Sequence, residues 1–271
     1  MKPQAFDYAR PDSAEEAVSL LADAGDDARI LAGGQSLMAV LNLRLAQPSV
    51  LIDISRVPDL NYVRVDGKHL AIGAAATQGS VEWRPGLKNE VPLLAQAFPH
   101  ISHFQIRNRG TVCGSVAHAD PSAELPLALL ALEGEVVLRS GRGRRVVAAA
   151  DFFQGMLMTA RAQDELVEEV RYPLAQAGVR YAFDEFSGRH GDFAVCAVAA
   201  VVKPDGIRLA VGGVSDRPVV RAWPRLDGAD LDAAINDFAW ELGAKDDYHA
   251  SAKFRRQLVR HLGRAAIDKA Q

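Results

Sequence analysis

Cysteine is almost absent from this chain, which has only Cys113 and Cys196 among its 271 residues. An iron–sulfur cluster takes four cysteine ligands, so the chain by itself cannot hold one. The two cysteines lie far apart in the sequence, and we expect two free thiols in a reducing compartment rather than a disulfide. Cys113 is expected to pack as a small hydrophobic side chain at a glycine turn, and Cys196 to lie in a buried strand.

Long apolar runs and an excess of positive charge are also missing. No stretch approaches the ~20 apolar residues of a membrane helix, and residues 1–8 contain no apolar signal core. We therefore expect a cytoplasmic protein without a membrane span. The net charge of -3 gives no positive field to attract a nucleic-acid partner. The hydrophobic share of 49% suffices for the core of one large or two modest domains.

Two familiar nucleotide motifs are missing too, namely the loop ending in Gly-Lys-Ser/Thr and the Gly-x-Gly-x-x-Gly turn. The chain instead has two glycine-bearing stretches, Ala-Gly-Gly-Gln-Ser at 32–36 and Thr-Val-Cys-Gly-Ser-Val-Ala-His-Ala-Asp-Pro at 111–121. Glycine lets successive backbone N–H groups approach a phosphate, so the two stretches together predict one diphosphate ligand. Two glycines after a strand also suit an ordinary tight turn, and turn chemistry alone leaves both interpretations open.

The residue pattern predicts an α+β protein that begins with a small α/β subdomain. Ser13 and Glu16 form a capping box that starts a helix ending at Gly25. The rest of this subdomain is predicted to contain a strand at 29–32, a helix at 37–45 and a strand at 50–54, and to end near Pro58.

A second subdomain is predicted to open with a hairpin around Asp66-Gly67. It continues with helices near 81, at 91–98 and at 123–132, and with strands at 136–139, 145–148 and 165–172. From about residue 178 we expect an antiparallel sheet of strands at 179–187, 193–203 and 207–214, followed by helices at 231–242 and 251–266.

Two arginine-rich segments invite a binding interpretation. The arginines around the turn at 140–143 are expected to form a solvated hairpin tip, because three charges on one loop do not make a binding face. The last helix carries Lys253, Arg255, Arg256, Arg260 and Arg264 beside its apolar stripe. That basic face is either solvated or a docking surface for an acidic partner subunit.

Four ordered motifs give the whole chain a specific resemblance to a known family. They are Ala-Gly-Gly-Gln-Ser-Leu at 32–37, Ile-Arg-Asn-Arg-Gly-Thr at 106–111, Cys-Gly-Ser-Val-Ala-His-Ala-Asp-Pro at 113–121 and Gly-Arg-His-Gly-Asp-Phe-Ala at 188–194. The chain resembles the FAD-binding medium subunit of the molybdenum hydroxylases, the family of xanthine dehydrogenase and carbon monoxide dehydrogenase. The resemblance implies a two-subdomain FAD-binding fold of the vanillyl-alcohol-oxidase/PCMH type at 1–176, with subdomains at about 1–58 and 59–176. It implies a C-terminal α+β domain at 177–271, of the carbon monoxide dehydrogenase flavoprotein type.

The resemblance also implies which residues hold FAD, with both glycine stretches on the diphosphate and the acidic pair Asp120 and Glu124 on the ribose side. Relatives often carry aspartate where Glu124 stands. The full predicted set is Ile30, Leu31, Ala32, Gly33, Gly34, Gln35, Ser36, Leu37, Ile101, Thr111, Gly114, Ser115, Ala117, His118, Asp120, Glu124 and Leu166.

Several of these residues also have an ordinary structural explanation. Asp120 suits the cap of a following helix, and Ile101 and Leu166 suit the core as well as a flavin contact. His118 has no histidine or cysteine at metal-ligand spacing, so no metal is expected there. The segment Arg189-His190-Gly191-Asp192 lies near the isoalloxazine ring in relatives but equally suits a charged turn beside a strand.

By resemblance, this chain is an electron-transfer subunit without catalytic acid–base residues of its own. Partner subunits are expected to carry the molybdopterin cofactor (large) and two [2Fe-2S] clusters (small), two copies of each of three subunits forming a heterohexamer, (αβγ)2. FAD would pass electrons from the clusters to an external acceptor while an organic substrate, such as an N-heterocycle or an aromatic acyl-CoA, is oxidised on the large subunit. The alternatives are a free-standing FAD-dependent oxidoreductase and a non-enzymatic nucleotide-binding protein.

Overall fold

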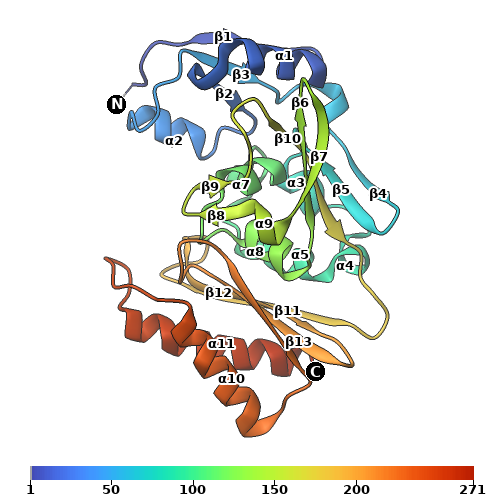
Figure 1. The fold of residues 1–271 in the computed structure, drawn as a ribbon, viewed down its shortest axis with the longest axis vertical. Helices are drawn as coiled ribbons and strands as arrows, with labels where there is room; N and C mark the ends of the chain where they lie inside the picture. The colour runs from blue at the N-terminus through green and yellow to red at the C-terminus, as the bar shows by residue number, and fades with distance from the viewer. Residues whose placement is uncertain (1) are drawn as a thin grey trace.

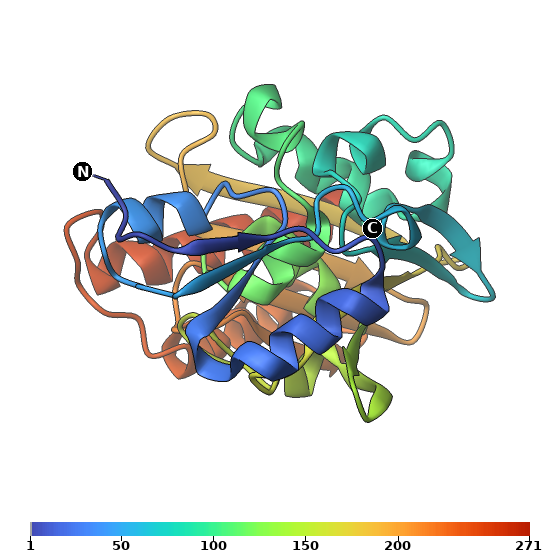
Figure 2. The same ribbon diagram turned by 90° about the horizontal axis from the view of Figure 1, so that it is seen from above.

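The computed structural model describes residues 2–271 and stacks three units along its long axis (Figure 1). The N-terminal unit has a parallel sheet in the order β1-β3-β2, made of β1 (Asp7–Ala9), β2 (Ala28–Leu31) and β3 (Val50–Asp53). Helix α1 (Ala14–Ala24) packs against β2 and β3, as the view from above shows (Figure 2), and α2 (Leu37–Asn42) follows β2. Single 3-10 turns lie at Gly25–Asp27 and Pro58–Leu60.

The predicted capping of α1 is present in a slightly different form. The Ser13 hydroxyl accepts a hydrogen bond from the Glu16 N–H at 3.1 Å. The Glu16 carboxylate in turn accepts a hydrogen bond from the N–H of Asp12 at 2.7 Å. A capping box would use the N–H of Ser13, one residue further along. Gly25 ends the helix with a φ of 56°, a conformation in which an L side chain would be strained.

The middle unit is built on an antiparallel sheet in the order β4-β5-β10-β6-β7. Its strands are β4 (Val63–Asp66), β5 (His69–Gly73), β6 (Glu135–Ser140), β7 (Gly143–Ala148) and β10 (Leu166–Pro173). Between β5 and β6 the chain forms α3 (Gln78–Glu82), α4 (Leu87–Glu90), α5 (Pro92–Ala97), a 3-10 turn (Phe98–His100), α6 (Phe104–Arg107), α7 (Val112–His118) and α8 (Glu124–Ala131). Helix α9 (Ala149–Phe152) and the two-stranded ribbon β8 (Phe153–Gly155) and β9 (Met158–Thr159) lead into β10.

The C-terminal unit is a four-stranded antiparallel sheet in sequence order with two helices on one face. It contains β11 (Arg180–Ser187), β12 (Ala194–Val202), β13 (Gly206–Gly212), β14 (Val219–Pro224), α10 (Gly228–Glu241) and α11 (Ala252–Lys269). All nine residues of β12 are buried, because α11 covers one side of this sheet and α8 of the middle unit covers the other.

Helix α8 joins the middle unit to the C-terminal sheet. Every one of its residues is buried, and it contacts α5, α7, β12 and β13. A helix that is apolar on all sides must be covered on all sides, which agrees with this central position. The hydroxyl of buried Tyr172 donates to the carbonyl of Leu125 at 3.1 Å, so β10 is tied to the same helix. The start of α8 is therefore held rigidly.

Most predicted elements are present, with the differences concentrated at short segments. The hairpin around Asp66-Gly67 is formed, and Gly67 has the positive φ (57°) that this turn needs. The predicted helix at 37–45 is shorter and ends at Asn42. Strands β1 and β14 and the short helix α7 were not anticipated, because three to seven residues give too little periodicity.

The arginine-rich hairpin between β6 and β7 is exposed at its tip, as predicted, and its side chains also form ion pairs. Its arginines are not merely solvated, because each pairs with an acidic side chain on or before β10. Arg144 contacts Glu168 at 2.5 Å, Arg145 contacts Glu165 at 2.6 Å, and Arg142 contacts Asp164 at 2.7 Å. These pairs hold the hairpin against the strand that borders the cavity described below.

The basic face of α11 is mostly engaged within the chain. Arg255 is buried and donates to the carbonyls of Val195 and Gly213 at 2.7 and 2.5 Å, and to Asp247 at 2.5 Å. Arg264 pairs with Asp232 and Asp268. These internal contacts leave little of the face for an acidic partner.

Replacing Arg255 with alanine should lower the free energy of unfolding by about 2–4 kcal/mol, because one buried and one partly buried carbonyl lose their donor. The neighbouring Arg256 lies over the Trp240 ring at 4.0 Å, and Trp240 is exposed. Arg256→Ala should therefore cost only about 0.5–1 kcal/mol. Urea unfolding of both variants checks this, and equal losses would contradict it.

Candidate functional site: a cavity between the three units

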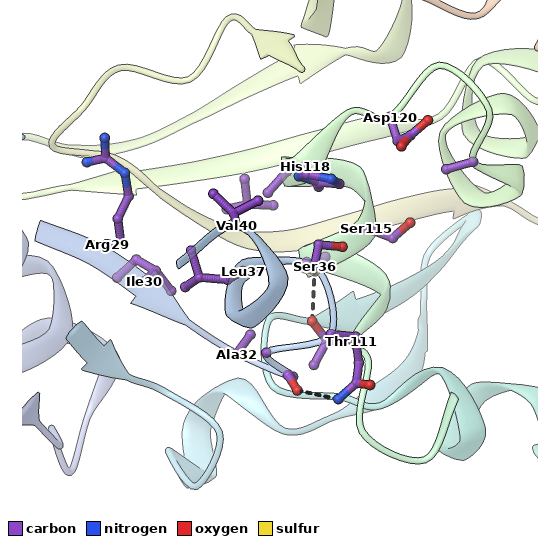
Figure 3. A pocket seen from close by; sticks show the side chains of 18 of the residues that line it. Arg29, Ile30, Ala32, Ser36, Leu37, Val40, Thr111, Ser115, His118 and Asp120 are labelled. Atoms are coloured by element: carbon purple, nitrogen blue, oxygen red, sulfur yellow. Dashed lines mark hydrogen bonds between the residues drawn. The ribbon is translucent and has the colours of Figure 1, made fainter. Parts of the chain in front are cut away.

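One elongated cavity of about 790 Å³ is lined by residues of all three units. Its volume lies in the upper part of the range of ~300–1,000 Å³ that is usual for small-molecule and cofactor sites. Figure 3 shows Arg29 and Ile30 at one end and Asp120 at the other, with Ser36, Thr111 and Ser115 along the wall between them. The shape therefore suits a long ligand with two different ends.

The first glycine stretch lies between β2 and α2 and approaches the backbone of Arg109 and Gly110, just before the second stretch. A Cβ on Gly33 would lie 2.2 Å from the carbonyl oxygen of Arg109 and 2.6 Å from the Cα of Gly110. Glycine is therefore required at position 33 because two backbone segments approach each other closely there. This reason is separate from the access to phosphate that the sequence predicted. Gly34 has a φ of 73°, and the Gln35 amide donates to the Gly33 carbonyl at 3.0 Å (Figure 3).

The second stretch contains the short helix α7 rather than only an irregular turn. Thr111 is the N-cap of α7, and its hydroxyl accepts from the N–H of Gly114 at 2.9 Å (Figure 3). A hydroxyl that accepts one hydrogen bond can still donate its own proton. The backbone of Thr111 also pairs with Thr77 in an isolated β-bridge, which fixes the start of the helix against the segment before α3.

Polar groups with no protein partner face this part of the cavity. Within residues 2–271, the hydroxyls of Ser36 and Ser115 make no hydrogen bond to another side chain or to the backbone. The Oε1 atom of Gln78 is buried and also lacks a partner in that range. Ser36 is exposed and Ser115 is half-buried, and their hydroxyls beside two loops can donate to a polar ligand such as a diphosphate.

The cavity brings together the residues that the sequence predicted. All of the predicted cofactor-binding residues line it except Leu31. Cys113 also lines the cavity, and its buried thiol donates to the Ile72 carbonyl at 3.3 Å. Burial raises the pKa of the Cys113 thiol far above its ordinary value, so this thiol stays protonated and acts in packing, as predicted.

At the acidic end of the cavity, the interpretation of Asp120 as the cap of the following helix is wrong. Asp120 accepts from the N–H of Ser122 at 2.8 Å, and α8 begins at Glu124 with Ala123 as its N-cap residue. Asp120 therefore closes a turn before α8 instead of capping it. Glu124 is 7% exposed, and burial, followed by the charge of Glu185, raises its pKa to about 8. Its side chain carries a proton at neutral pH.

The raised pKa of Glu124 predicts a pH-dependent stability. The folded chain keeps the Glu124 proton up to about pH 8, whereas the unfolded chain loses it near 4.5. The folded state then binds more protons, so this group's contribution to stability falls as pH rises from about 5 to 8. Glu124→Gln replaces the titrating carboxyl with a neutral amide, so the unfolding free energy of the variant relative to wild type should increase by up to about 1.4 kcal/mol per pH unit in that window. Urea unfolding at pH 5, 6.5 and 8 measures this difference, and a constant difference would contradict the assignment.

Some lining residues had no signal in the sequence. Arg161 is largely buried, and its guanidinium donates to the carbonyls of Ala162, Gln163 and Glu165. Burial, with a smaller effect of Arg29, lowers the pKa of Arg161. Gln78 reaches the site only because Thr77 pairs with Thr111, and no local motif marks either residue.

The motif at 188–194 is split between the cavity and its surroundings. Gly191, Asp192 and Phe193 line the cavity, whereas Arg189 and His190 are exposed and do not. A Cβ on Gly191 would lie 3.0 Å from the carbonyl oxygen of Ser102, so this loop of the C-terminal unit packs against the middle unit.

Comparison with known proteins places this chain in a family. Residues 4–175 match the family model described as the FAD binding domain in molybdopterin dehydrogenase. The chain is 40% identical over 282 residues to the nicotine 6-hydroxylase medium subunit of Paenarthrobacter nicotinovorans, covering 100% of this chain and 99% of that protein. It superimposes on reconstituted CO dehydrogenase from Oligotropha carboxidovorans with a TM-score of 0.95 and 31% identity, covering 100% and 99% of the two chains. For quinoline 2-oxidoreductase from Pseudomonas putida 86 the TM-score is 0.92, with 32% identity and coverage of 100% and 98%.

The chain therefore belongs to the FAD-binding family of molybdopterin dehydrogenases. It is an FAD-binding subunit of the medium type, part of a molybdenum-dependent oxidoreductase, and the predicted α+β FAD-binding fold is confirmed. Within residues 2–271 we find no helix whose length and apolar content would let it cross a lipid bilayer.

Proposed function

We propose that this chain carries electrons from iron–sulfur clusters of a partner subunit, through FAD, to an external acceptor. The observation that carries the proposal is the cavity, where two backbone loops meet beside unpartnered hydroxyls and a buried amide oxygen. FAD would supply the redox chemistry, and the chain would supply binding, orientation and exclusion of water. Two cysteines cannot ligate a cluster of this kind alone, so the electrons must come from another polypeptide.

We also propose an orientation for FAD, based on the two loops and the two ends of the cavity. We assign the diphosphate to the backbone and hydroxyls of 33–36 and 111–115, where charge-assisted hydrogen bonds contribute about 1.5–3 kcal/mol each. The adenosine would then lie toward Arg29 and Ile30, and the flavin toward 191–193. This orientation moves Asp120 and Glu124 to the flavin side, whereas the resemblance places them on the ribose side. The remaining predicted residues, among them Ile101, Ala117, His118 and Leu166, would line the flavin side. This orientation follows the resemblance of the 188–194 motif to a segment near the flavin in relatives.

Membership of the family supports a proposal for the partners and the organic substrate. We propose a large molybdopterin subunit and a small iron–sulfur subunit, assembled as two copies of each of three subunits, in the cytoplasm, where the free thiols stay reduced. We also propose that the chain divides into an FAD-binding domain at 1–176 and a C-terminal domain at 177–271. Two of the compared proteins are named for nicotine and quinoline, both N-heterocycles, and we propose a related substrate on the large subunit.

Purification of the chain from its native host under mild conditions tests this proposal. We expect flavin absorption together with a large molybdenum-containing and a small iron–sulfur polypeptide. Removing FAD from that complex should abolish reduction of the external acceptor, while chemical reduction of the iron–sulfur centres persists. Turnover of an organic substrate by the lone chain would instead support a free-standing oxidoreductase, and a colourless chain that FAD cannot reconstitute would support a non-flavin binding protein.

A further inference from the structure

The C-terminal sheet presents one of its edge strands to the middle unit. β11 is the first strand in the order β11-β12-β13-β14, and α5 of the middle unit packs against it (Figure 1). An edge strand carries a row of N–H and C=O groups that no neighbouring strand pairs. The partners that these groups find in the middle unit therefore fix where the C-terminal unit docks.

One side chain of α5 takes the place of a neighbouring strand. The Gln96 amide donates to the carbonyl of Tyr181 at 3.1 Å, and Oε1 of Gln96 accepts from the N–H of Phe183, also at 3.1 Å. One residue of a parallel strand would bond in the same way to two residues spaced two positions apart. A shift of β11 by one residue along its axis would break both bonds, so Gln96 ties the strand at one register.

Side chains on one face of β11 continue the junction toward the cavity. Phe183 is buried in the large core shared with the middle unit, and its ring centroid lies 5.2 Å from that of His100. Two residues further along, Oε1 of Glu185 lies 3.5 Å from Nδ1 of the same histidine. Ala182, between them on the opposite face, packs in the separate core of the C-terminal unit. β11 is therefore held by both units at once.

β11 leads directly into the loop at 188–193, which reaches the cavity. The carbonyl of Arg189 accepts from the N–H of Asp192 at 3.0 Å and from the hydroxyl of Ser187 at 2.9 Å. These bonds close the loop on itself and hold its shape. Residues 191–193 line the cavity, so their position there depends on where β11 docks.

The middle unit meets this loop at a strained residue. Ser102 lines the cavity with a φ of 43°, a left-handed conformation that is uncommon for residues other than glycine. Its carbonyl oxygen accepts from Arg107 at 3.3 Å, and a Cβ on Gly191 would lie 3.0 Å from the same oxygen. A strained conformation persists only where the surrounding structure holds it. Arg107 and the loop hold Ser102 from two sides.

We propose that Gln96 is a positioning residue for the flavin half of FAD. It holds β11, and through β11 the loop at 188–193, at the end of the cavity to which we assign the flavin. The inference rests on the proposed function, because the orientation of FAD is taken from it. Gln96 itself lies outside the lining of the cavity. Its effect therefore falls on the flavin and spares the diphosphate and adenosine, which we assign to the loops at 33–36 and 111–115 and to the opposite end.

Calorimetric titration of the full chain with FAD and with ADP tests this division. Gln96→Leu keeps a side chain of similar size and removes both hydrogen bonds to β11. We expect its affinity for FAD to fall at least tenfold, while its affinity for ADP stays within twofold of wild type. An affinity for FAD within twofold of wild type, or an equal loss for FAD and ADP, would overturn the inference.

Asn236→Leu provides the matched control, because it removes another partly buried amide of the C-terminal unit. Asn236 lies on α10, and its Oδ1 accepts from Nε of Arg260 on α11 at 2.8 Å, away from β11. Both ligands should bind this variant as they bind wild type. A selective loss of FAD affinity as large as that of Gln96→Leu would trace the effect to general loosening of the unit and overturn the inference.

Hydrogen exchange of the wild-type chain keeps the inference falsifiable if Gln96→Leu fails to fold. FAD should slow exchange of the amides at 188–193 at least tenfold, whereas ADP should leave it unchanged. Equal protection by both ligands, or no protection by FAD, would overturn the inference. Failure of the proposed function is distinguishable, because wild type would then bind no FAD, which overturns both. An unchanged variant beside FAD-binding wild type overturns only the role of Gln96.

Discussion

Gly33→Ala should abolish stoichiometric FAD binding and reduce the affinity for FAD at least a hundredfold. The added Cβ would lie 2.2 Å from the Arg109 carbonyl oxygen and 2.6 Å from the Gly110 Cα, and both of these are backbone atoms. They can yield only if the two loops separate, and the diphosphate donors are held by that contact. A loss of ~2.7 kcal/mol in binding corresponds to a hundredfold change, about what one or two charge-assisted hydrogen bonds contribute. Flavin fluorescence during titration of the purified chain measures the affinity.

Gly141→Ala is the control for this substitution. A Cβ at Gly141 meets nothing within 4 Å, and the residue lies at the tip of the hairpin between β6 and β7. The variant should bind FAD like wild type. If Gly33→Ala also bound FAD with wild-type affinity, the contact between the two loops would have no role in forming the site.

Arg107→Met should destabilise the chain by about 3–5 kcal/mol, because it leaves the charge of Glu82 unpaired in a largely buried position. The Arg107 guanidinium contacts both Glu82 oxygens, at 2.7 and 3.0 Å, and their side chains are 10% and 13% exposed. It also donates to the carbonyl of Ile101 at 2.7 Å. Since Ile101 and Ser102 line the cavity, FAD binding should weaken together with stability. Urea unfolding and FAD titration measure the two effects.

Arg109 supplies a matched control two residues further along the same motif. Its side chain is exposed and makes no hydrogen bond or ion pair with residues 2–271. Arg109→Met should change stability by less than ~0.5 kcal/mol. The double variant Glu82→Gln/Arg107→Met should recover part of the loss, since it leaves no uncompensated charge. A double variant no more stable than Arg107→Met would contradict the ion-pair explanation.

The sequence predicted the glycine stretches and the surrounding residues because their chemistry is local. Gly33, Gly34 and Ser36 stand in one short segment, and Thr111 to Ser115 in another, so each could be recognised without knowing the fold. The reason for Gly33 was not accessible, because the atom it avoids belongs to Arg109, 76 positions along the chain. The helical nature of 112–118 was missed because seven residues with a glycine inside carry a weak helical signal.

The features of the site that the sequence did not predict depend on contacts between segments far apart in the chain. Glu124 was predicted as a cofactor contact, but the raised pKa of its carboxyl depends on burial at the start of α8 and on the charge of Glu185 on β11. Gln78 and Arg161 line the cavity through pairings of strands and loops that have no sequence motif. The acidic partners of the arginine hairpin lie about twenty residues further along, so its ion pairs appear only once β7 and β10 are placed.

The most direct test of the central claim is calorimetric titration of the purified full chain with FAD, in competition with ADP and with FMN. The two loops predict one FAD per chain, competition by ADP, which shares the diphosphate and adenosine, and at most weak competition by FMN, which lacks both. Failure of FAD to bind, or equal competition by FMN and ADP, would contradict a site organised around the diphosphate.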